Sequence, residues 1–168
     1  MNKKLRVFEA FAGIGAQASA LKRIGINFEI VGISEWFIDA LNCYDALHNE
    51  GISISKPSIE EIEKELTAHT FSRDSSKPIP DIRRIGQNQM ENLYYSHKKS
   101  KNFGSITEID PATMPESDLL IYSFPCQDLS TGGKTEGMEE GSGTRSSLLW
   151  EIKRILLGLK ERNILPRY

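Results

Sequence analysis

Cys126 is the residue best placed in this sequence to act as a nucleophile. It follows a short strand-like run, Asp118 to Phe124, and Pro125 restricts the backbone immediately before it. The residues from Ser130 to Thr144 are glycine-rich and polar, which predicts a loop after the thiol. A thiol at a strand end beside such a loop is a good nucleophile candidate. A cysteine within a helix is usually an inert core residue, as we expect for Cys43.

A second set of residues has the types and spacing needed to hold a nucleoside-like ligand. Gly13 and Gly15 follow an apolar run, and the helix formers after them place the unpaired N–H groups of a helix start at this turn. Glu35 comes about 20 residues later, the spacing at which a carboxylate accepts the ribose hydroxyls in Rossmann-type sites. Trp36 adds a flat apolar face for an adenine ring or a sulfonium. The glycines alone are a weak signal, because the third glycine of the dinucleotide fingerprint is missing and a tight structural turn would look the same.

These side chains need a framework that brings their segments together, and the apolar pattern indicates a parallel sheet with crossover helices. Ligands of open parallel sheets bind at the carboxyl ends of the strands, so Gly13, Glu35 and Cys126 are expected to face one crevice. The predicted elements are strands at 5–11, 28–33 and 118–124 and helices at 16–24, 38–48 and 146–159, with the start of a further strand at 164–168.

Residues 50–102 have a different composition, rich in Ser, Lys, Pro, Asn and Glu. A short amphipathic helix is predicted near residues 59–66, and we expect the remainder of the segment to be a surface insertion. The whole chain, with 168 residues of which 39% are hydrophobic, has the size of one domain.

Charge and cysteine content exclude several classes of protein. A net charge of −2 gives no sign of a strongly basic phosphate-binding surface. Two cysteines without a CxxC spacing predict neither a zinc site nor a disulfide framework, so no metal is expected. The N-terminal apolar run is broken by Glu9, and no segment approaches the ~18 apolar residues of a membrane span, which favours a cytoplasmic protein without a membrane partner.

Four motifs resemble, in chain order, the N-terminal motifs of the bacterial DNA (cytosine-5) methyltransferases. They are FAGIG at 11–15, SEW at 34–36, FPCQDLS at 124–130 with Gly133-Lys134, and TRSSLL at 144–149. The resemblance covers the ordered parts of the chain. It implies an α/β, Rossmann-like S-adenosylmethionine-dependent methyltransferase fold with a parallel sheet, truncated to the N-terminal part of the catalytic domain.

The resemblance also assigns roles residue by residue. Cys126 would attack C6 of a cytosine flipped out of double-stranded DNA, which makes C5 nucleophilic enough to take a methyl group. Glu35 would hold the ribose hydroxyls of S-adenosyl-L-methionine and Trp36 would pack against that cofactor. The remaining cofactor residues would be Phe11, Gly13, Ile14, Gly15, Ala16, Ser105, Ile106, Pro125 and Leu148, and the loop over the DNA would contain Gln127, Ser130, Lys134 and Arg145.

The sequence departs from the family pattern in two respects. Ser105 stands where the family has an aspartate that accepts from the adenine amino group, which predicts a site weaker by ~1 kcal/mol. The Glu-Asn-Val motif and the target-recognition domain are absent from these 168 residues. We therefore expect a fragment or a split subunit of a restriction-modification enzyme, inactive alone, whose missing motifs a second polypeptide would supply. Two alternatives stay open: a degenerate binding or assembly module that keeps the fold, and an NAD-dependent oxidoreductase.

Overall fold

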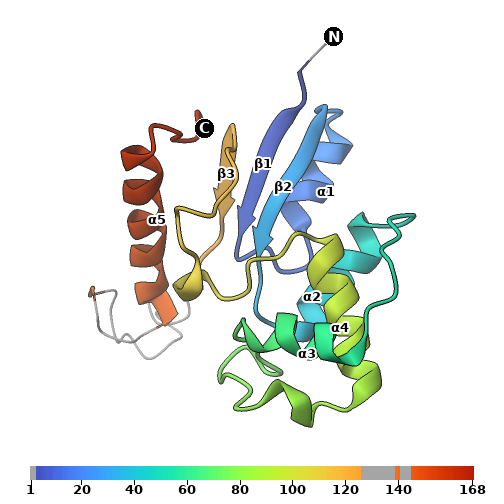
Figure 1. The fold of residues 1–168 in the computed structure, drawn as a ribbon. Coiled ribbons are helices and arrows are strands. Elements are labelled where there is room, and N and C mark those ends of the chain that lie inside the picture. Colours follow the sequence, from blue (N-terminus) through green and yellow to red (C-terminus); the bar gives the residue numbers. More distant parts are fainter. Residues whose placement is uncertain (1–2, 126–138, 141–144) are drawn as a thin grey trace, which may run out of the picture.

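A three-stranded parallel sheet, in the order β2-β1-β3, forms the centre of the fold (Figure 1). The computed structural model describes residues 3–125, 139–140 and 145–168. The strands are β1 (Leu5–Ala10), β2 (Phe28–Ser34) and β3 (Leu119–Tyr122). Because all three run in one direction, their carboxyl ends meet at one edge of the sheet, and the predicted α/β class with a parallel sheet is confirmed.

The pairing of β1 with β2 contains a bulge at Val31. Val7 pairs with Ile30 and Phe8 pairs with Gly32, so one residue of β2 is left without a partner in the ladder. Gly32 is required at this point, because an added Cβ would lie 2.8 Å from the Phe8 ring and 2.9 Å from the Phe103 ring. The two aromatic side chains therefore pack directly over the β2 backbone.

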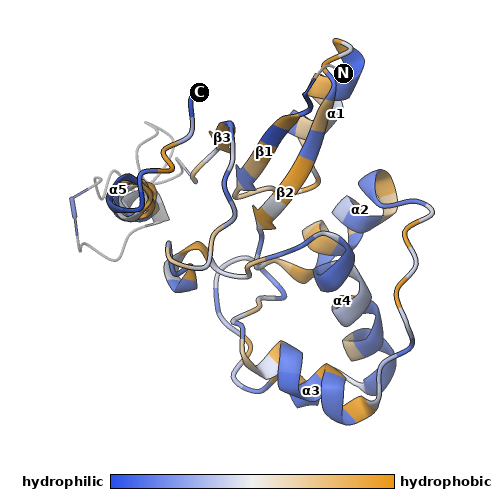
Figure 2. Ribbon diagram, turned by 45° about the horizontal axis from the view of Figure 1, so that its top comes forward, coloured by the Kyte–Doolittle hydropathy of each residue, from blue (hydrophilic) through white to orange (hydrophobic). Residues whose placement is uncertain are grey.

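Helices cover both faces of the sheet. Alternate side chains of β1 point to opposite faces, and Glu9 meets the start of α1 (Ala16–Arg23) through a hydrogen bond of 2.9 Å from the Ala18 amide. Phe8 and Ala10 point the other way and share a core with α5 (Leu149–Glu161). Figure 2 shows α5 nearly end-on beside β3, and its buried residues are Ile152, Ile155 and Leu159.

The segment 50–102 is not the surface insertion that its composition suggested. After α2 (Ile38–His48) it forms α3 (Ile59–Thr67) and α4 (Gln87–Lys99), which pack together (Figure 1). Leu66, Phe71 and Leu93 are fully buried in one core with residues of α2. The helix α3 agrees with the prediction, whereas α4 was missed because its few apolar residues are diluted by polar ones on the exposed faces.

Cys43 is exposed on α2, so the expectation of a core cysteine is wrong. The helix turns Leu41 and Tyr44 toward the core, and Cys43 falls between them in sequence but on the outer face. Leu47, near the end of the same helix, is also exposed, at 57%.

The strand β3 is less buried than its apolar sequence predicts. Leu119 to Ile121 are half-buried and Tyr122 is 44% exposed, because β3 is an outer strand among the described residues. Tyr168 lies beside it: its amide donates to the Asp118 carbonyl and its carbonyl accepts from the Leu120 amide, each at 3.0 Å. That is the hydrogen-bond pattern of parallel strands, in agreement with the predicted strand start at 164–168.

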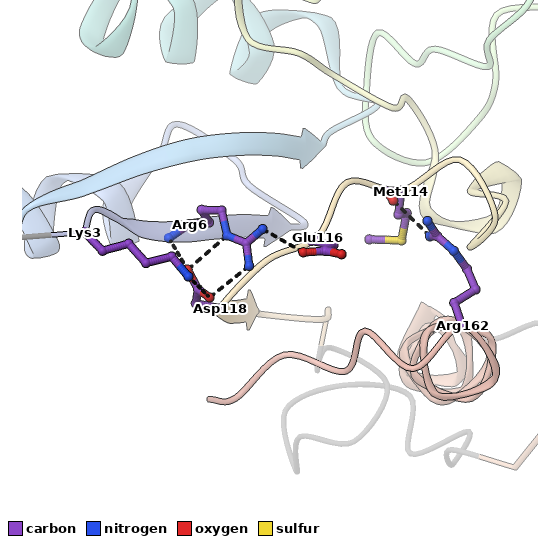
Figure 3. A network of polar contacts seen from close by, with 6 residues as sticks. All are labelled: Lys3, Arg6, Met114, Glu116, Asp118 and Arg162. Atoms are coloured by element: carbon purple, nitrogen blue, oxygen red, sulfur yellow. Dashed lines mark hydrogen bonds and ion pairs between the residues drawn. The ribbon is translucent and has the colours of Figure 1, made fainter.

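Arg6 ties the starts of β1 and β3 together (Figure 3). Its guanidinium donates to both carboxylate oxygens of Asp118, at 3.0 and 3.1 Å, and to Glu116 at 3.0 Å. The hydrogen bonds from the Arg6 side chain and backbone hold the pKa of Asp118 well below its usual range. Arg162, further along, donates to the Met114 carbonyl at 2.9 Å and so fixes the end of α5 (Figure 3). None of the helices in the described part of the chain combines the length and hydropathy of a membrane span.

Candidate functional site

A pocket of about 510 Å³ opens where the carboxyl ends of β1 and β2 meet. Phe11 follows β1 directly, Glu35 and Trp36 follow β2, and Pro125 comes shortly after β3. Its volume lies within the range of small-molecule sites, and apolar surface dominates its walls. The predicted cofactor residues that line it are Phe11, Gly13, Glu35, Trp36, Ser105, Ile106, Pro125 and Leu148.

Glu35 is the acidic group of this pocket, and the backbone around it fixes its carboxylate. One oxygen accepts from the Gly13 amide at 2.8 Å and the other from the Phe37 amide at 2.7 Å. Burial raises the pKa of Glu35, and the hydrogen bonds from these backbone amides oppose that rise. Each carboxylate oxygen keeps a further lone pair, so the group can still accept two hydroxyl protons from a ligand.

Ile14, Gly15 and Ala16 do not line the pocket. Gly15 has a left-handed backbone, with φ of 79°, and an added Cβ would lie 2.2 Å from Nε2 of His48. Ile14 is 53% exposed, and its carbonyl lies 3.1 Å from the same His48 nitrogen. The second glycine of the turn therefore lets α2 approach, while Gly13 is the glycine whose amide meets Glu35.

The start of α1 is already occupied by a carboxylate of the protein. Glu9 is 1% exposed and accepts hydrogen bonds from the Ala18 amide at 2.9 Å and from the Tyr44 hydroxyl at 2.7 Å. The sequence predicted that these helix N–H groups are available to a ligand, and it did not identify Glu9 as their partner. The position of Glu9 inside an apolar strand could have indicated this role, because a buried carboxylate requires hydrogen-bond donors as partners.

Ser105 and Thr107 form the polar part of the opposite wall. Their hydroxyl oxygens are 2.9 Å apart, and Ser105 precedes the short 3-10 helix η2 (Ile106–Glu108). The neighbouring Gly104 is held against β2, because its carbonyl accepts from the Ser34 hydroxyl at 2.8 Å. The side chain of Ser105 thus offers a neutral hydrogen-bond group to the pocket, where the family pattern has an acid.

One wall of the pocket comes from the segment between α3 and α4, which the sequence did not assign to the site. Thr70, Ser75, Ser76 and Pro78 line the pocket. The segment is anchored beside Trp36 through Ser72, whose amide donates to the Trp36 carbonyl at 2.8 Å. Nothing in the polar composition of this stretch distinguishes a pocket wall from a surface loop, so tertiary packing alone reveals the role.

The last wall contains Pro125 and Leu148, and Ser146 connects them. Ser146 is fully buried and its hydroxyl donates to the Pro125 carbonyl at 3.1 Å, from the 3-10 helix η3 (Arg145–Leu148). Arg145 belongs to η3 by its backbone. The predicted nucleophile Cys126 and the loop residues Gln127, Ser130 and Lys134 lie outside the described residues, although Pro125 is the residue before Cys126 in the chain.

Comparison with known proteins identifies the class. Residues 83–165 match the family of C-5 cytosine-specific DNA methylases, and the parallel α/β sheet is that of a Rossmann-like methyltransferase fold. Together with the relatives below, this match shows that the chain belongs to that family. The resemblance drawn from the four motifs is thereby confirmed.

Three relatives illustrate the similarity. The orphan methyltransferase M.SssI of Spiroplasma monobiae is 44% identical over 175 residues, covering 99% of this chain and 45% of that protein. The type II methyltransferase M2.ScrFI of Lactococcus lactis subsp. cremoris is 40% identical, covering 90% and 43%. The orphan methyltransferase M.Rho11sI of Bacillus phage rho11s is 30% identical, covering 98% and 22%. The chain thus spans less than half the length of these relatives.

Proposed function

We propose that this chain supplies the cofactor pocket and the nucleophile of a DNA (cytosine-5) methyltransferase of a restriction-modification system. The observation that carries the proposal is the pocket itself, which joins Glu35, after β2, with Pro125, the residue that precedes Cys126. Glu35 and the residue that precedes the thiol in the chain therefore lie at the same edge of the parallel sheet.

The pocket fits S-adenosyl-L-methionine by the chemistry of its walls. Glu35 has free acceptor capacity for two ribose hydroxyls, and Trp36 and Phe11 offer aromatic surface for an adenine. Ile106, Pro125 and Leu148 would exclude water from the rest of the ligand. When bound, this cofactor supplies an electrophilic methyl group on a sulfonium.

Cys126 would act on the second substrate, a cytosine flipped out of double-stranded DNA. Its thiolate would form a bond to C6 of the ring, the electrons of the C5–C6 double bond would move to C5, and C5 would take the methyl group. Loss of the C5 proton would then restore the double bond and release the thiolate. Gln127, Ser130, Lys134 and Arg145 would contact the DNA around this base.

The chain alone is expected to be inactive, because the family's Glu-Asn-Val motif and target-recognition domain are not among its residues. A second polypeptide carrying these parts would complete the site. Transfer of a tritiated methyl group to duplex DNA by the purified chain alone would contradict this expectation.

Two experiments test the function. In the first, calorimetric titrations with S-adenosylhomocysteine and with NAD separate a methyltransferase pocket from that of an oxidoreductase, and we expect binding of the former only.

In the second, DNA containing 5-fluorocytosine is incubated with the chain, the cofactor and the completing polypeptide. A covalent adduct at Cys126 that is absent from Cys126→Ser, but retained by Cys43→Ser, excludes a degenerate binding module.

A further inference from the structure

We propose that Asn102 is a positioning residue that holds two opposite walls of the pocket in register for the cofactor. This inference rests on the proposed function, because it concerns how the same pocket recognises S-adenosyl-L-methionine. Asn102 lines no part of the pocket itself, so its effect would pass through Glu35 on one side and through Gly104 and Ser105 on the other.

The Asn102 amide group is bonded to the backbone on both sides. Its Oδ1 accepts from the Glu35 amide at 2.9 Å and from the Gly104 amide at 3.2 Å, and its Nδ2 donates to the Glu35 carbonyl at 2.9 Å. The residue is 7% exposed, so water does not replace these partners easily. One side chain therefore fixes the backbone of the ribose-binding acid and the backbone that leads into Ser105.

His97 sets the direction of this amide from behind. Its Nδ1 lies 3.2 Å from Asn102 Nδ2, which is already fixed as a donor by its bond to the Glu35 carbonyl. Nδ1 must therefore accept, and the ring proton lies on Nε2, which faces a Glu65 oxygen at 3.4 Å. Burial, together with the neighbouring His69, lowers the pKa of His97 to about 3, in keeping with a neutral ring in this role.

The same tautomer explains why the cluster of Glu65, His69 and His97 is a structural support. The ligand atoms of these residues lie within 4.8 Å of one another, the spacing of a possible metal site. A metal at His97 Nε2 would need the proton on Nδ1, where it would face the donor Nδ2 of Asn102. Lys98 also places its ammonium 3.1 Å from the Glu65 carboxylate. The geometry therefore favours a hydrogen-bonded chain from α3 through α4 to Asn102.

The backbone beside Asn102 is engaged elsewhere and does not replace the hydrogen bonds that the Asn102 side chain makes. Residues 101–103 lie next to the end of β2, where the Phe103 amide donates to the Ile33 carbonyl at 2.9 Å. Gly104 then turns with a left-handed φ of 72° beneath His69. Without the Asn102 amide, the Glu35 and Gly104 amides would lose buried acceptors at the same time.

The experiment measures coupling between Asn102 and the ribose. S-adenosylhomocysteine and its 2′-deoxy analogue are titrated into the wild-type chain, Asn102→Ala and the control Asn49→Ala, well below each melting temperature. Asn49 is a suitable control because its half-buried amide bonds to Asp45 and Ser100, away from the pocket. We expect Asn102→Ala to bind S-adenosylhomocysteine at least about tenfold more weakly, and to lose most of the preference for the 2′-hydroxyl, because the Glu35 backbone is no longer held by the Asn102 amide.

Binding by Asn102→Ala within about twofold of wild type would overturn the proposal. So would weaker binding with an unchanged preference for the 2′-hydroxyl, since that result indicates only general destabilisation. A wild-type chain that binds neither ligand would overturn the proposed function, and the role of Asn102 with it.

A measurement on the wild-type chain covers the case in which Asn102→Ala does not fold. Amide hydrogen exchange should show the Glu35 and Gly104 N–H groups protected before any ligand is added, because Asn102 already accepts from both. Rapid exchange at these two amides in the free protein would contradict the proposal even if the pocket binds the cofactor.

Discussion

The hydroxyl of Tyr44 donates to a carboxylate oxygen of Glu9 at 2.7 Å, deep between the sheet and the helices α1 and α2. The other oxygen accepts from the Ala18 amide in the first turn of α1. Burial raises the pKa of Glu9, and the hydrogen bond from Tyr44 opposes that rise. Burial also raises the pKa of Tyr44, and the contact with Glu9 adds to this rise because a phenolate would face the carboxylate.

Glu9→Gln should reduce the pH dependence of folding stability. Between the ordinary pKa of 4.5 and the raised value, the native state holds a proton that the unfolded chain has lost. The contribution of Glu9 to stability therefore increases as the pH falls through the raised pKa toward 4.5. Gln can accept from Ala18 and donate to the Tyr44 oxygen, so we expect a stability within about 1 kcal/mol of wild type and a smaller pH slope.

Urea unfolding at several pH values between 4 and 8 measures this slope. Glu29→Gln is the matched control, because Glu29 is an exposed acid of β2 and its replacement should leave the slope unchanged. An unaltered pH slope in Glu9→Gln would show that the buried carboxylate does not titrate in this interval.

Asp118→Asn should destabilise the fold at neutral pH. The carboxylate of Asp118 accepts two bonds from the Arg6 guanidinium and links β1 to β3, and its pKa is lowered by these bonds. Its stabilising contribution is therefore complete above the ordinary pKa of 3.8 and is lost as the pH falls through the lowered value. We expect a lower urea midpoint at pH 7 and a reduced loss of stability on acidification.

Asp81→Asn provides the comparison for this ion pair. Asp81 bonds to Arg83, two residues away, so the pair connects no distant elements. Its replacement should change the midpoint less than Asp118→Asn, and equal shifts would argue against a specific role for the link between β1 and β3.

Gly15→Ala should destabilise the chain more than Gly13→Ala. Both glycines have a positive φ, which disfavours a Cβ, but only at Gly15 would the new atom meet His48 Nε2, at 2.2 Å. At Gly13 nothing lies within 4 Å. We expect Gly13→Ala to lower the free energy of unfolding by about 1 kcal/mol from the backbone alone, and Gly15→Ala to lower it clearly more. Thermal unfolding followed by circular dichroism ranks the two, and the reverse order would contradict the contact with His48.

Ligand binding should change the fluorescence of Trp36. The chain has two tryptophans, and Trp36 lines the pocket whereas Trp150 lies in α5 beneath the Lys153 ammonium, 4.8 Å from its ring. Titration of S-adenosylhomocysteine should therefore quench wild type and Trp150→Phe alike, and leave Trp36→Phe nearly silent. A signal that follows Trp150 would place the ligand elsewhere.

The sequence predicts the parts of the fold whose residues interact locally. The elements around Gly13, Glu35 and α5 agree with their predicted positions because apolar spacing and glycine stops determine them. The helix α4 could not be predicted in this way, since Met90 and Leu93 become buried only through packing against α2 and α3.

The residues of the site likewise fall into those that the local sequence predicts and those that it does not. Glu35 and Trp36 could be selected from residue type and strand position, and both line the pocket. The Ser75-Ser76 wall and the Asn102 amide could not be found, because their partners lie far away in sequence and nothing local marks them. Gly15 correctly indicates a tight turn, yet the residue that excludes a Cβ at this position is His48, 33 residues away in sequence.

Arg6 and Phe11 lie at opposite ends of β1, roughly 16 Å apart along an extended strand. The ion pair between Arg6 and Asp118 and the pocket beside Phe11 are therefore separate regions that share no partner in the described residues. Changes at one end should combine additively with changes at the other. A protein engineer can accordingly reinforce the scaffold at Arg6 and Asp118 while leaving ligand selectivity untouched.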